Sequence, residues 1–239
     1  MKIQKINTYY KNKKYPIILG ISSIDHNSLF KERKEFLHHS ELEFFDQIKY
    51  EHKRKNFLQS RHLAKSILSK YLKEANLSKI AIFHGVFNQP LIDYPTNKIP
   101  TISISHTQTL AACIVSPSIF PIGIDIEKIT ENSKENITSQ TTLHEKRNLK
   151  YKEDDNIFYT RIWTVKEALS KVLKTGIMSP FKIFEIKDII YTKNYTISKF
   201  SNFNQYHAIS YHYEQNILSY IIPSNSNLLD FDKILIPVR

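Results

Sequence analysis

The 239-residue chain is poor in cysteine and in glycine. Its one cysteine, Cys113, excludes an intrachain disulfide and any zinc site built from several thiolates. So few thiols are typical of a protein that works in a reducing compartment. Glycine occurs four times, and two of these residues, Gly123 and Gly176, lie within or just after the two segments that we single out below.

The chain also lacks a long apolar run. The first one, from Tyr15 to Ile21, contains Pro16 and is too short for the core of a signal peptide or for a membrane-spanning helix. We therefore expect a cytoplasmic protein with no membrane partner.

Negative charge is in short supply, because 23 Asp and Glu stand against 34 Lys and Arg and leave a formal charge of +11. Such a charge attracts acidic partners over a long range, whether they are proteins or nucleic acids. The basic residues are dispersed, and no RNA-recognition, KH, zinc-finger or helix-turn-helix signature is present. Binding to nucleic acid is therefore a low-ranked alternative, and we expect no specific nucleic-acid partner.

Hydrophobic periodicity alternates between helical and extended along the chain, and the hydrophobic content of 41% is ordinary for a packed core. Helical spacing is found over residues 41–75 and again over about 157–174. A polar stretch at 131–156 separates them and is typical of a linker or loop. Short β-like runs follow each helical region, at 80–83, 102–105, 110–115 and 122–126, then at 182–190, 206–213 and 217–223. We expect the first four runs to form one sheet.

Helix followed by strands thus occurs twice, although no residue-level repeat is apparent. The pattern predicts an α+β fold made of two similar α/β halves in a pseudo-twofold arrangement, with the active site in the cleft between them. We place the N-terminal half at 1–130, the linker at 131–156 and the C-terminal half at 157–239, and we expect a monomer.

The segment from Ile122 to Glu127 alternates isoleucine with Gly123, Asp125 and Glu127. In an extended strand the two carboxylates share one face, with Cα atoms roughly 7 Å apart, and can converge on one hard cation. Magnesium takes one or two carboxylates and completes its shell with water and phosphate oxygens. We expect Gly123 to leave room on this face for a bulky ligand. The alternative is an ordinary strand with a solvated polar face.

The segment from Arg161 to Lys174 has an apolar stripe at helical spacing, and Trp163, Glu167, Ser170, Lys171 and Lys174 lie on another face. This face presents an aromatic ring, an acid and two ammonium groups together. The alternatives are that Glu167 and Lys171 form an exposed ion pair one turn apart and that Trp163 belongs to the core.

Two further candidates lie upstream. Ser105 and His106 end a β-like run, where a turn can expose them, although a core or capping histidine is the alternative. Neither a Ser-His-acid triad nor a histidine spacing suited to a metal is evident around them.

The Gly123–Glu127 strand and, about forty residues later, the Trp163–Lys171 helix together resemble the paired motifs of the 4'-phosphopantetheinyl transferases. The upstream Ser105–His106 pair and the chain length resemble the larger, two-halved type that activates surfactin synthetase. The resemblance covers about residues 40 to 190. It implies transfer of the 4'-phosphopantetheine group of coenzyme A to a serine of an acidic acyl or peptidyl carrier protein, with release of 3',5'-ADP.

The resemblance also implies residue roles. Asp125, Glu127 and Glu167 would hold Mg²⁺, and Glu167 and Lys171 would be catalytic. Coenzyme A, the co-substrate, would be bound by four residues: Arg61, Ser105, His106 and Lys171. For Arg61 the alternative is an exposed helical arginine.

The sequence departs from the family pattern before Pro90, where Asn88 and Gln89 stand in place of a glycine and a basic residue. Asn88 tolerates the left-handed conformation that the glycine adopts, so we expect the turn to be kept. Gln89 removes one phosphate-binding charge, for which Lys49, Lys53 or Arg54 could compensate.

The alternative enzyme is another magnesium-dependent phosphotransferase or phosphohydrolase, which would need no carrier protein.

Overall fold

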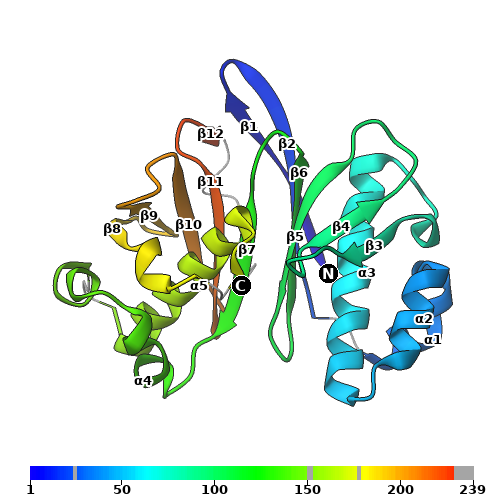
Figure 1. Ribbon diagram of the computed structural model, residues 1–239, viewed down its shortest axis with the longest axis horizontal. Helices are drawn as coiled ribbons and strands as arrows, with labels where there is room; N and C mark the ends of the chain where they lie inside the picture. The colour runs from blue at the N-terminus through cyan, green and yellow to red at the C-terminus, as the bar shows by residue number, and fades with distance from the viewer. Residues whose placement is uncertain (24–25, 150–152, 177–178, 229–239) are drawn as a thin grey trace. The chain divides into compact units, whose positions relative to one another are not determined.

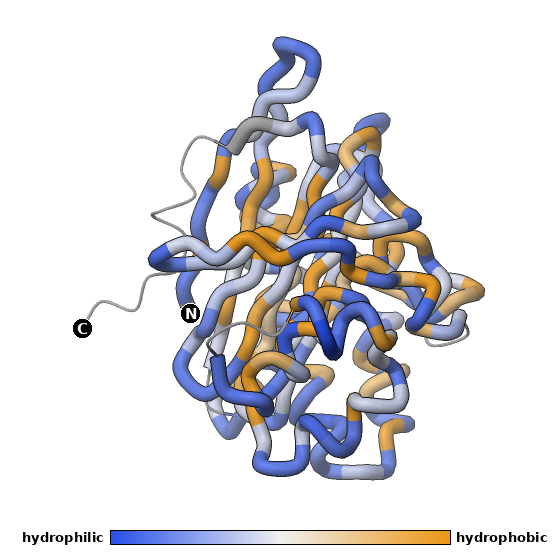
Figure 2. The backbone as a smooth tube through the Cα atoms, turned by 90° about the vertical axis from the view of Figure 1, so that its left-hand side faces the viewer, coloured by the Kyte–Doolittle hydropathy of each residue, from blue (hydrophilic) through white to orange (hydrophobic). Residues whose placement is uncertain are grey.

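The computed structural model describes residues 1–23, 26–149, 153–176 and 179–228 (Figure 1). The chain divides into two compact units, unit 1 (Met1–Phe120) and unit 2 (Pro121–Arg239). In Figure 2 the apolar stretches run along the strands and helices, and most turns between them are hydrophilic.

Unit 1 consists of an antiparallel sheet, a long helix packed on it and a separate hairpin. Its elements are β1 (Lys2–Tyr10), β2 (Lys13–Ser22), α1 (His26–Phe36), α2 (His39–Gln47), α3 (Glu51–Leu72), a 3-10 turn (Leu77–Lys79), β3 (Ala81–His84), β4 (Pro90–Asp93), β5 (Pro100–His106) and β6 (Ala111–Pro117). The sheet runs β1-β2-β6-β5, and β3 pairs with β4. Leu63 and Ile67 of α3 pack on Ile18 of β2 and Val115 of β6 in the core.

Unit 2 has the same ingredients. Its elements are β7 (Gly123–Lys128), α4 (Ser133–Ile137), a 3-10 turn (Thr138–Gln140), a π-helical turn (Glu145–Leu149), α5 (Asp155–Leu173), a 3-10 turn (Phe181–Phe184), β8 (Ile186–Tyr191), β9 (Thr196–Phe200), β10 (Tyr206–Tyr213), β11 (Asn216–Pro223) and β12 (Asn227–Leu228). The antiparallel sheet runs β7-β11-β10-β9-β8. Ile162, Val165 and Leu169 of α5 form its core with Ala208 and Ile221 of the sheet.

Elements of the two units occur in the same order along the chain. In each unit one strand leads through short helices to a long helix, which is followed by four strands that end beside the first: β2 pairs with β6, as β7 pairs with β11. The predicted α+β class and the two similar halves are therefore confirmed. Strand β1, with its hairpin turn at Lys11 and Asn12, both at positive φ, is an addition to unit 1 that sequence patterning did not predict.

A buried lysine–glutamate pair holds each unit together in the same way. In unit 2, Lys166 and Glu145 are both 0% exposed, and Lys166 Nζ lies 2.8 Å from Glu145 Oε2. Glu145 also accepts hydrogen bonds from the backbone amides of Thr142 (2.7 Å) and Ile186 (2.8 Å). One carboxylate thus ties the long helix, a preceding turn and the first strand after the helix to one another.

Unit 1 repeats this pair with Lys65 and Glu41. Glu41 accepts from the backbone amides of His38 (2.9 Å) and Ile82 (3.2 Å). The glutamate precedes the isoleucine by 41 positions in both units. Because both amide bonds to the glutamate recur with the same spacing, and a lysine of the long helix pairs with that glutamate in each unit, Lys65 corresponds to Lys166. The following residues, Ser66 and Glu167, then correspond too.

The helices and first strands align in the same register. Helix α3 is followed by the C-cap residue Lys73 (φ +59°) and α5 by the C-cap residue Lys174 (φ +57°), each with its amide bonded to a serine carbonyl four residues earlier. On the strands, Gly20 and Gly123 are the residues that face the long helix of their own unit. Ser22 of unit 1 therefore stands where unit 2 has Asp125.

Three sequence-based expectations are corrected. The unit boundary falls after Phe120 rather than at 130, because β7 pairs with β11 and so belongs to unit 2. For the same reason the first four β-like runs do not form one sheet. The stretch at 131–156 is not a simple linker, because α4 and the π-helical turn lie within it and Glu145 is buried there; its residues 150–152 lie outside the described part of the chain.

No helix in the described ranges is long and apolar enough to cross a membrane.

Candidate functional site

The first predicted segment forms β7, and its polar face lies beneath α5. A Cβ at Gly123 would lie 2.2 Å from the carbonyl oxygen of Ala168, so the glycine makes room for the helix backbone. Asp125, on the same face, is 3% exposed. The alternative of an ordinary strand with a solvated polar face is therefore wrong at Asp125, and the expectation that Gly123 makes room for a ligand is also wrong.

Helix α5 fulfils the periodicity predicted for the second segment and begins two residues earlier than expected. Its residue Lys171 reaches back to β7, where Nζ donates to Asp125 Oδ1 at 2.7 Å and to the Ile124 carbonyl at 2.9 Å. The ion pair of Lys171 is thus with Asp125, whose side chain is 4% exposed. The alternative of an exposed ion pair with Glu167 is wrong.

Two further carboxylates, Glu127 on β7 and Glu167 on α5, are half-buried near Asp125. Burial, and after it the charge of Asp125, raises the pKa of Glu127 to about 7, against a hydrogen bond from Trp163 and the charge of Lys171. Burial and Asp125 also raise the pKa of Glu167. Asp125 is therefore close enough to Glu127 and Glu167 to disfavour the negative charge of both, which is a common property of functional sites.

Trp163 fits both of the readings that the sequence left open. Its ring packs on Phe181 with centroids 4.8 Å apart, as expected of a core residue. Its indole N–H donates to Glu127 at the same time, so the tryptophan also orients one of the three acids.

Magnesium suits these residues in the chemistry of the donor set. All three side chains offer hard carboxylate oxygens, and a cation would relieve the repulsion that raises the pKa of Glu127 and Glu167. Across the described residues, however, no three acidic, histidine or cysteine side chains are arranged to hold a metal ion as they stand. The cation on Asp125 is the ammonium of Lys171.

Small hydroxyl side chains fix α5 to the sheet beside these acids. Ser219, the cross-strand neighbour of Asp125 on β11, bonds Thr164 of α5 at 2.7 Å and Ser210 of β10 at 2.8 Å. Together with the buried Lys166–Glu145 pair, they hold the helix at one rotation about its axis. Sequence reasoning missed Lys166 and Glu145, although a lysine next to the acid in an apolar-striped helix was a signal that could have been used.

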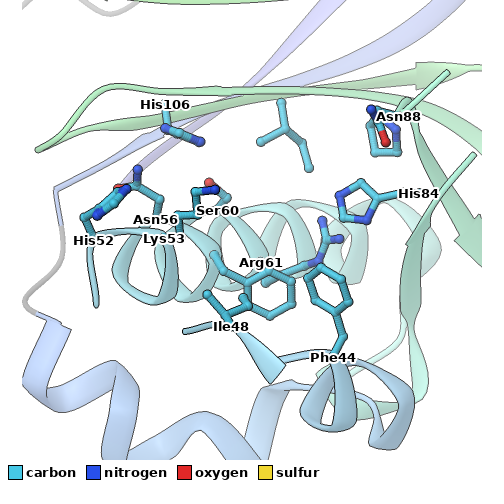
Figure 3. A pocket seen from close by; sticks show the side chains of 13 residues that line it. Phe44, Ile48, His52, Lys53, Asn56, Ser60, Arg61, His84, Asn88 and His106 are labelled. Atoms are coloured by element: carbon cyan, nitrogen blue, oxygen red, sulfur yellow. The ribbon is translucent and has the colours of Figure 1, made fainter. Parts of the chain in front are cut away.

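The other predicted residues belong to unit 1, where a pocket of about 640 Å³ opens beside α3 (Figure 3). Its lining combines aromatic, apolar, amide and basic side chains: Phe44, Ile48, His52, Lys53, Asn56, Phe57, Ser60, Arg61, His84, Asn88, Pro90, Ile104 and His106.

Arg61 lines this pocket although its side chain is only 6% exposed, so the alternative of an exposed helical arginine is wrong. Its Nε lies 3.2 Å from Glu41 Oε1, and its guanidinium carbon lies 4.9 Å from the centroid of the Phe57 ring. Within the described part of the chain, Arg61 donates no hydrogen bond to the protein.

His106 also lines the pocket, but Ser105 does not. Because side chains alternate along β5, Ser105 lies on the face opposite to Ile104 and His106. A role for Ser105 in binding coenzyme A stays a prediction.

The hairpin between β3 and β4 carries the departures noted before Pro90. Asn88 has φ +58°, which confirms the left-handed turn expected there. Gln89 does not line the pocket, and its side-chain oxygen accepts from the Phe87 amide at 2.9 Å. Of the three residues that could compensate for the missing charge, Lys53 lines the pocket, whereas Lys49 and Arg54 do not.

Residues 121–222 match the sequence model of the 4'-phosphopantetheinyl transferase superfamily. The match covers the three acids, Trp163 and Lys171, and it lies within unit 2. No curated protein sequence matches the chain.

Solved structures similar to this chain include three holo-acyl-carrier-protein synthases. One from Bacillus anthracis, in complex with CoA (3',5'-ADP), is 24% identical, with a TM-score of 0.36, over 41% of this chain and 93% of that one. One from Neisseria meningitidis is 17% identical, with a TM-score of 0.35, over 42% and 96%. One from Plasmodium yoelii is 14% identical, with a TM-score of 0.34, over 49% and 97%.

Proposed function

We propose that this chain is a 4'-phosphopantetheinyl transferase of the larger, two-halved type, which moves the phosphopantetheine arm of coenzyme A to a serine of an acyl or peptidyl carrier protein. The superfamily match of residues 121–222 supports the general activity, and the two similar units in one chain support the two-halved type.

One observation carries the proposal. Inside the matched segment, Asp125 lies close enough to Glu127 and Glu167 to raise the pKa of both, and Lys171 contacts Asp125, the most buried of the three. A cluster of acids beside one ammonium suits phosphoryl transfer, in which catalysis consists mostly of positioning and of charge stabilisation.

In the proposed reaction the carrier serine oxygen forms a bond to the β-phosphorus of coenzyme A, and the bond from that phosphorus to 3',5'-ADP breaks. Magnesium, held by Asp125, Glu127 and Glu167, would supply positive charge against the pyrophosphate. Glu167, whose pKa is raised by burial and by Asp125, is suited to accept the serine proton. Lys171 would stabilise the departing oxygen.

For the nucleotide end of coenzyme A we propose the pocket of unit 1. Phe44 and Phe57 offer ring faces for a base, and Arg61, Lys53 and His106 offer positive charge or donors for phosphate. The formal charge of +11 would steer an acidic carrier protein toward the chain, an effect that weakens with salt.

The deciding experiment incubates the protein with coenzyme A, Mg²⁺ and a panel of apo carrier proteins, and follows addition of the phosphopantetheine group by intact mass. We expect addition to at least one carrier and none when Mg²⁺ is chelated. If no carrier is modified while coenzyme A or another phosphate ester is hydrolysed, the alternative phosphohydrolase replaces this proposal.

Glu167→Gln tests whether the acid takes part. General-base catalysis is typically worth about 10² to 10⁴ in rate, so transfer should fall at least about a hundredfold with little change in melting temperature. The matched control is Glu214→Gln, an exposed turn residue of the same unit, which should transfer like the parent. Near-normal transfer by Glu167→Gln would remove the residue from the mechanism.

A further inference from the structure

A second cavity of unit 1, of about 490 Å³, opens where the last turn of α3 meets strands β1 and β2. This lysine pocket is lined by four apolar or aromatic residues and by three lysines. It shares no residue with the pocket beside Arg61, and it lies outside the segment that matches the superfamily. Its volume is in the range of small-molecule sites, which combine an apolar lining with a few polar groups in the same way.

The floor of the lysine pocket belongs to the core of unit 1. Ile18 is 5% exposed, and Ile3 and Tyr71 pack on the same core cluster. Ile3 is the cross-strand partner of Gly20, which faces α3, so Ile3 lies on the helix side of the sheet. Because packing in the core holds these side chains, the apolar part of the pocket is preformed.

The charge of the three lysines is not offset by any other residue of the lining. Lys5, Lys70 and Lys73 are exposed, and none of them pairs with a carboxylate in the part of the chain that the structure describes. Strands β1 and β2, from Lys2 to Ser22, contain no acidic residue. Glu74, which follows the helix, accepts from a tyrosine hydroxyl at 3.0 Å and from a backbone amide at 2.9 Å, and it does not line the pocket. The pocket therefore presents positive charge alone.

Comparison with unit 2 shows that Lys70 has lost the partner of its counterpart. In the shared register of the two long helices, Lys70 corresponds to Lys171. Lys171 donates to Asp125 at 2.7 Å, whereas unit 1 has Ser22 in the place of Asp125 and offers no carboxylate there. The ammonium group of Lys70 lines the lysine pocket instead.

Lysines near the end of a helix also offset the helix dipole. That explanation fits Lys70 and Lys73, but it does not fit Lys5, which comes from β1 and has Ile18 as its cross-strand partner. A solvated basic surface would not need an apolar cavity between its lysines either. The convergence of three lysines from two elements on one apolar cavity is the observation that points to a ligand.

We propose that the lysine pocket binds a small organic anion in which an apolar group carries a carboxylate, a sulfonate or a phosphate. The apolar group lies on Ile3, Ile18 and Tyr71, and the acid group lies among the ammonium groups at the rim. Lysine suits the rim because its stem covers apolar surface while its head stays in water. Burial of the apolar group supplies affinity, and the charges select an anion over a neutral molecule of the same shape.

The test compares octanoate with octanol, which have the same chain and differ in charge. Each is titrated into the full chain, and its affinity is taken from the amide chemical shifts of Ile3 and Tyr71, so that binding elsewhere does not enter. The parent should bind octanoate about tenfold more tightly than octanol, and in the double variant Lys5→Gln/Lys70→Gln this preference should fall to about twofold or less. The varied lysines are exposed, so the fold should be kept.

The matched control is Lys31→Gln/Lys34→Gln, which removes the same charge from exposed lysines of α1 and should keep the preference of the parent. Absence of shifts at Ile3 and Tyr71 would overturn the inference, as would equal affinity of the parent for the two probes. An equal loss of preference in the control would overturn it too, because general attraction by the positive chain would then be enough. Transfer to a carrier protein is judged separately, since no varied residue belongs to the acid cluster or to the pocket beside Arg61.

Discussion

Units 1 and 2 share a scaffold and differ in the charges placed on it. Both have the long helix that ends at a left-handed lysine, the glycine under that helix and the buried lysine–glutamate pair. Where unit 2 has Asp125 and Glu167, unit 1 has Ser22 and Ser66. Where unit 1 has the pocket arginine Arg61, the register of the helices gives unit 2 an isoleucine, at 162.

The residues that hold each unit together are thus the ones the units have in common, and the residues proposed for chemistry are the ones that differ. Unit 1 collects cationic groups around a cavity, and unit 2 collects carboxylates under a helix. Substitutions at equivalent shared positions should therefore lower stability whichever unit carries them. Substitutions at equivalent positions where the units differ should change function in one unit alone.

The largest contrast is expected at the pair Asp125 and Ser22. Asp125→Asn removes the charge that Lys171 and a metal ion both use, and transfer should fall by about a hundredfold to a thousandfold. Ser22→Ala should transfer like the parent, because the hydroxyl of Ser22 is buried without a hydrogen bond to the described residues. Carrier modification by intact mass measures both. Near-normal transfer by Asp125→Asn would end the proposed division between the units.

The buried pairs should differ in strength although their geometry is shared. Lys166→Met leaves Glu145 buried without a cation, which should lower the free energy of unfolding by roughly 3–5 kcal/mol. Lys65→Met should cost less, because Arg61 Nε still lies 3.2 Å from Glu41. Urea midpoints of the two variants provide the comparison. An equal or larger loss for Lys65→Met would show that Arg61 does not share the charge of Glu41.

The two glycines offer a matched pair of smaller effects. Gly123→Ala places a Cβ against the Ala168 carbonyl, so α5 must move, at a cost of about 1–3 kcal/mol. In Gly20→Ala the new Cβ meets the side-chain ends of Ile67 at 2.8 Å and Leu63 at 3.0 Å, which can change rotamer. Its free energy of unfolding should therefore stay within about 1 kcal/mol of the parent's. Similar losses would mean that the two helices approach their sheets equally closely.

The smallest expected effect concerns the ammonium on Asp125. Lys171→Met removes a positive charge 2.7 Å from the carboxylate, and the variant should bind Mn²⁺, used as a probe for Mg²⁺, about tenfold more tightly, or about 1.4 kcal/mol. Titration followed by electron paramagnetic resonance measures this without activity. Lys174→Met, at the exposed end of the helix, is the control. Weaker binding in Lys171→Met would place the metal away from Asp125.

Local periodicity was enough to predict the elements that carry the acids. The alternating isoleucines gave β7, and the apolar stripe gave α5, because each pattern is complete within a dozen residues or so. The left-handed turn at Asn88 was predictable for the same reason, since it depends on one residue's own conformational preference.

Contacts between distant segments could not be predicted in this way. The bond from Lys171 to Asp125 spans 46 positions. Sequence patterning placed the carboxylate of Asp125 on an outward face, whereas in the structure it is buried and paired with this lysine. Glu145 looked like part of a polar linker, because nothing in its neighbourhood reveals the lysine of α5 that draws it inside. The lack of information on distant contacts also explains the misplaced unit boundary, since only pairing with β11 assigns β7 to unit 2.

The glutamate that closes each unit also has a consequence for the exchange of backbone hydrogens with solvent. The amides of Ile82 and Ile186 are held by a side-chain carboxylate, and their residues are 2% and 0% exposed. Neither amide proton can exchange until its hydrogen bond to the carboxylate breaks. The exchange rate of each amide therefore reports the opening of its own unit only. Two signals in a single spectrum therefore separate the opening of unit 1 from that of unit 2.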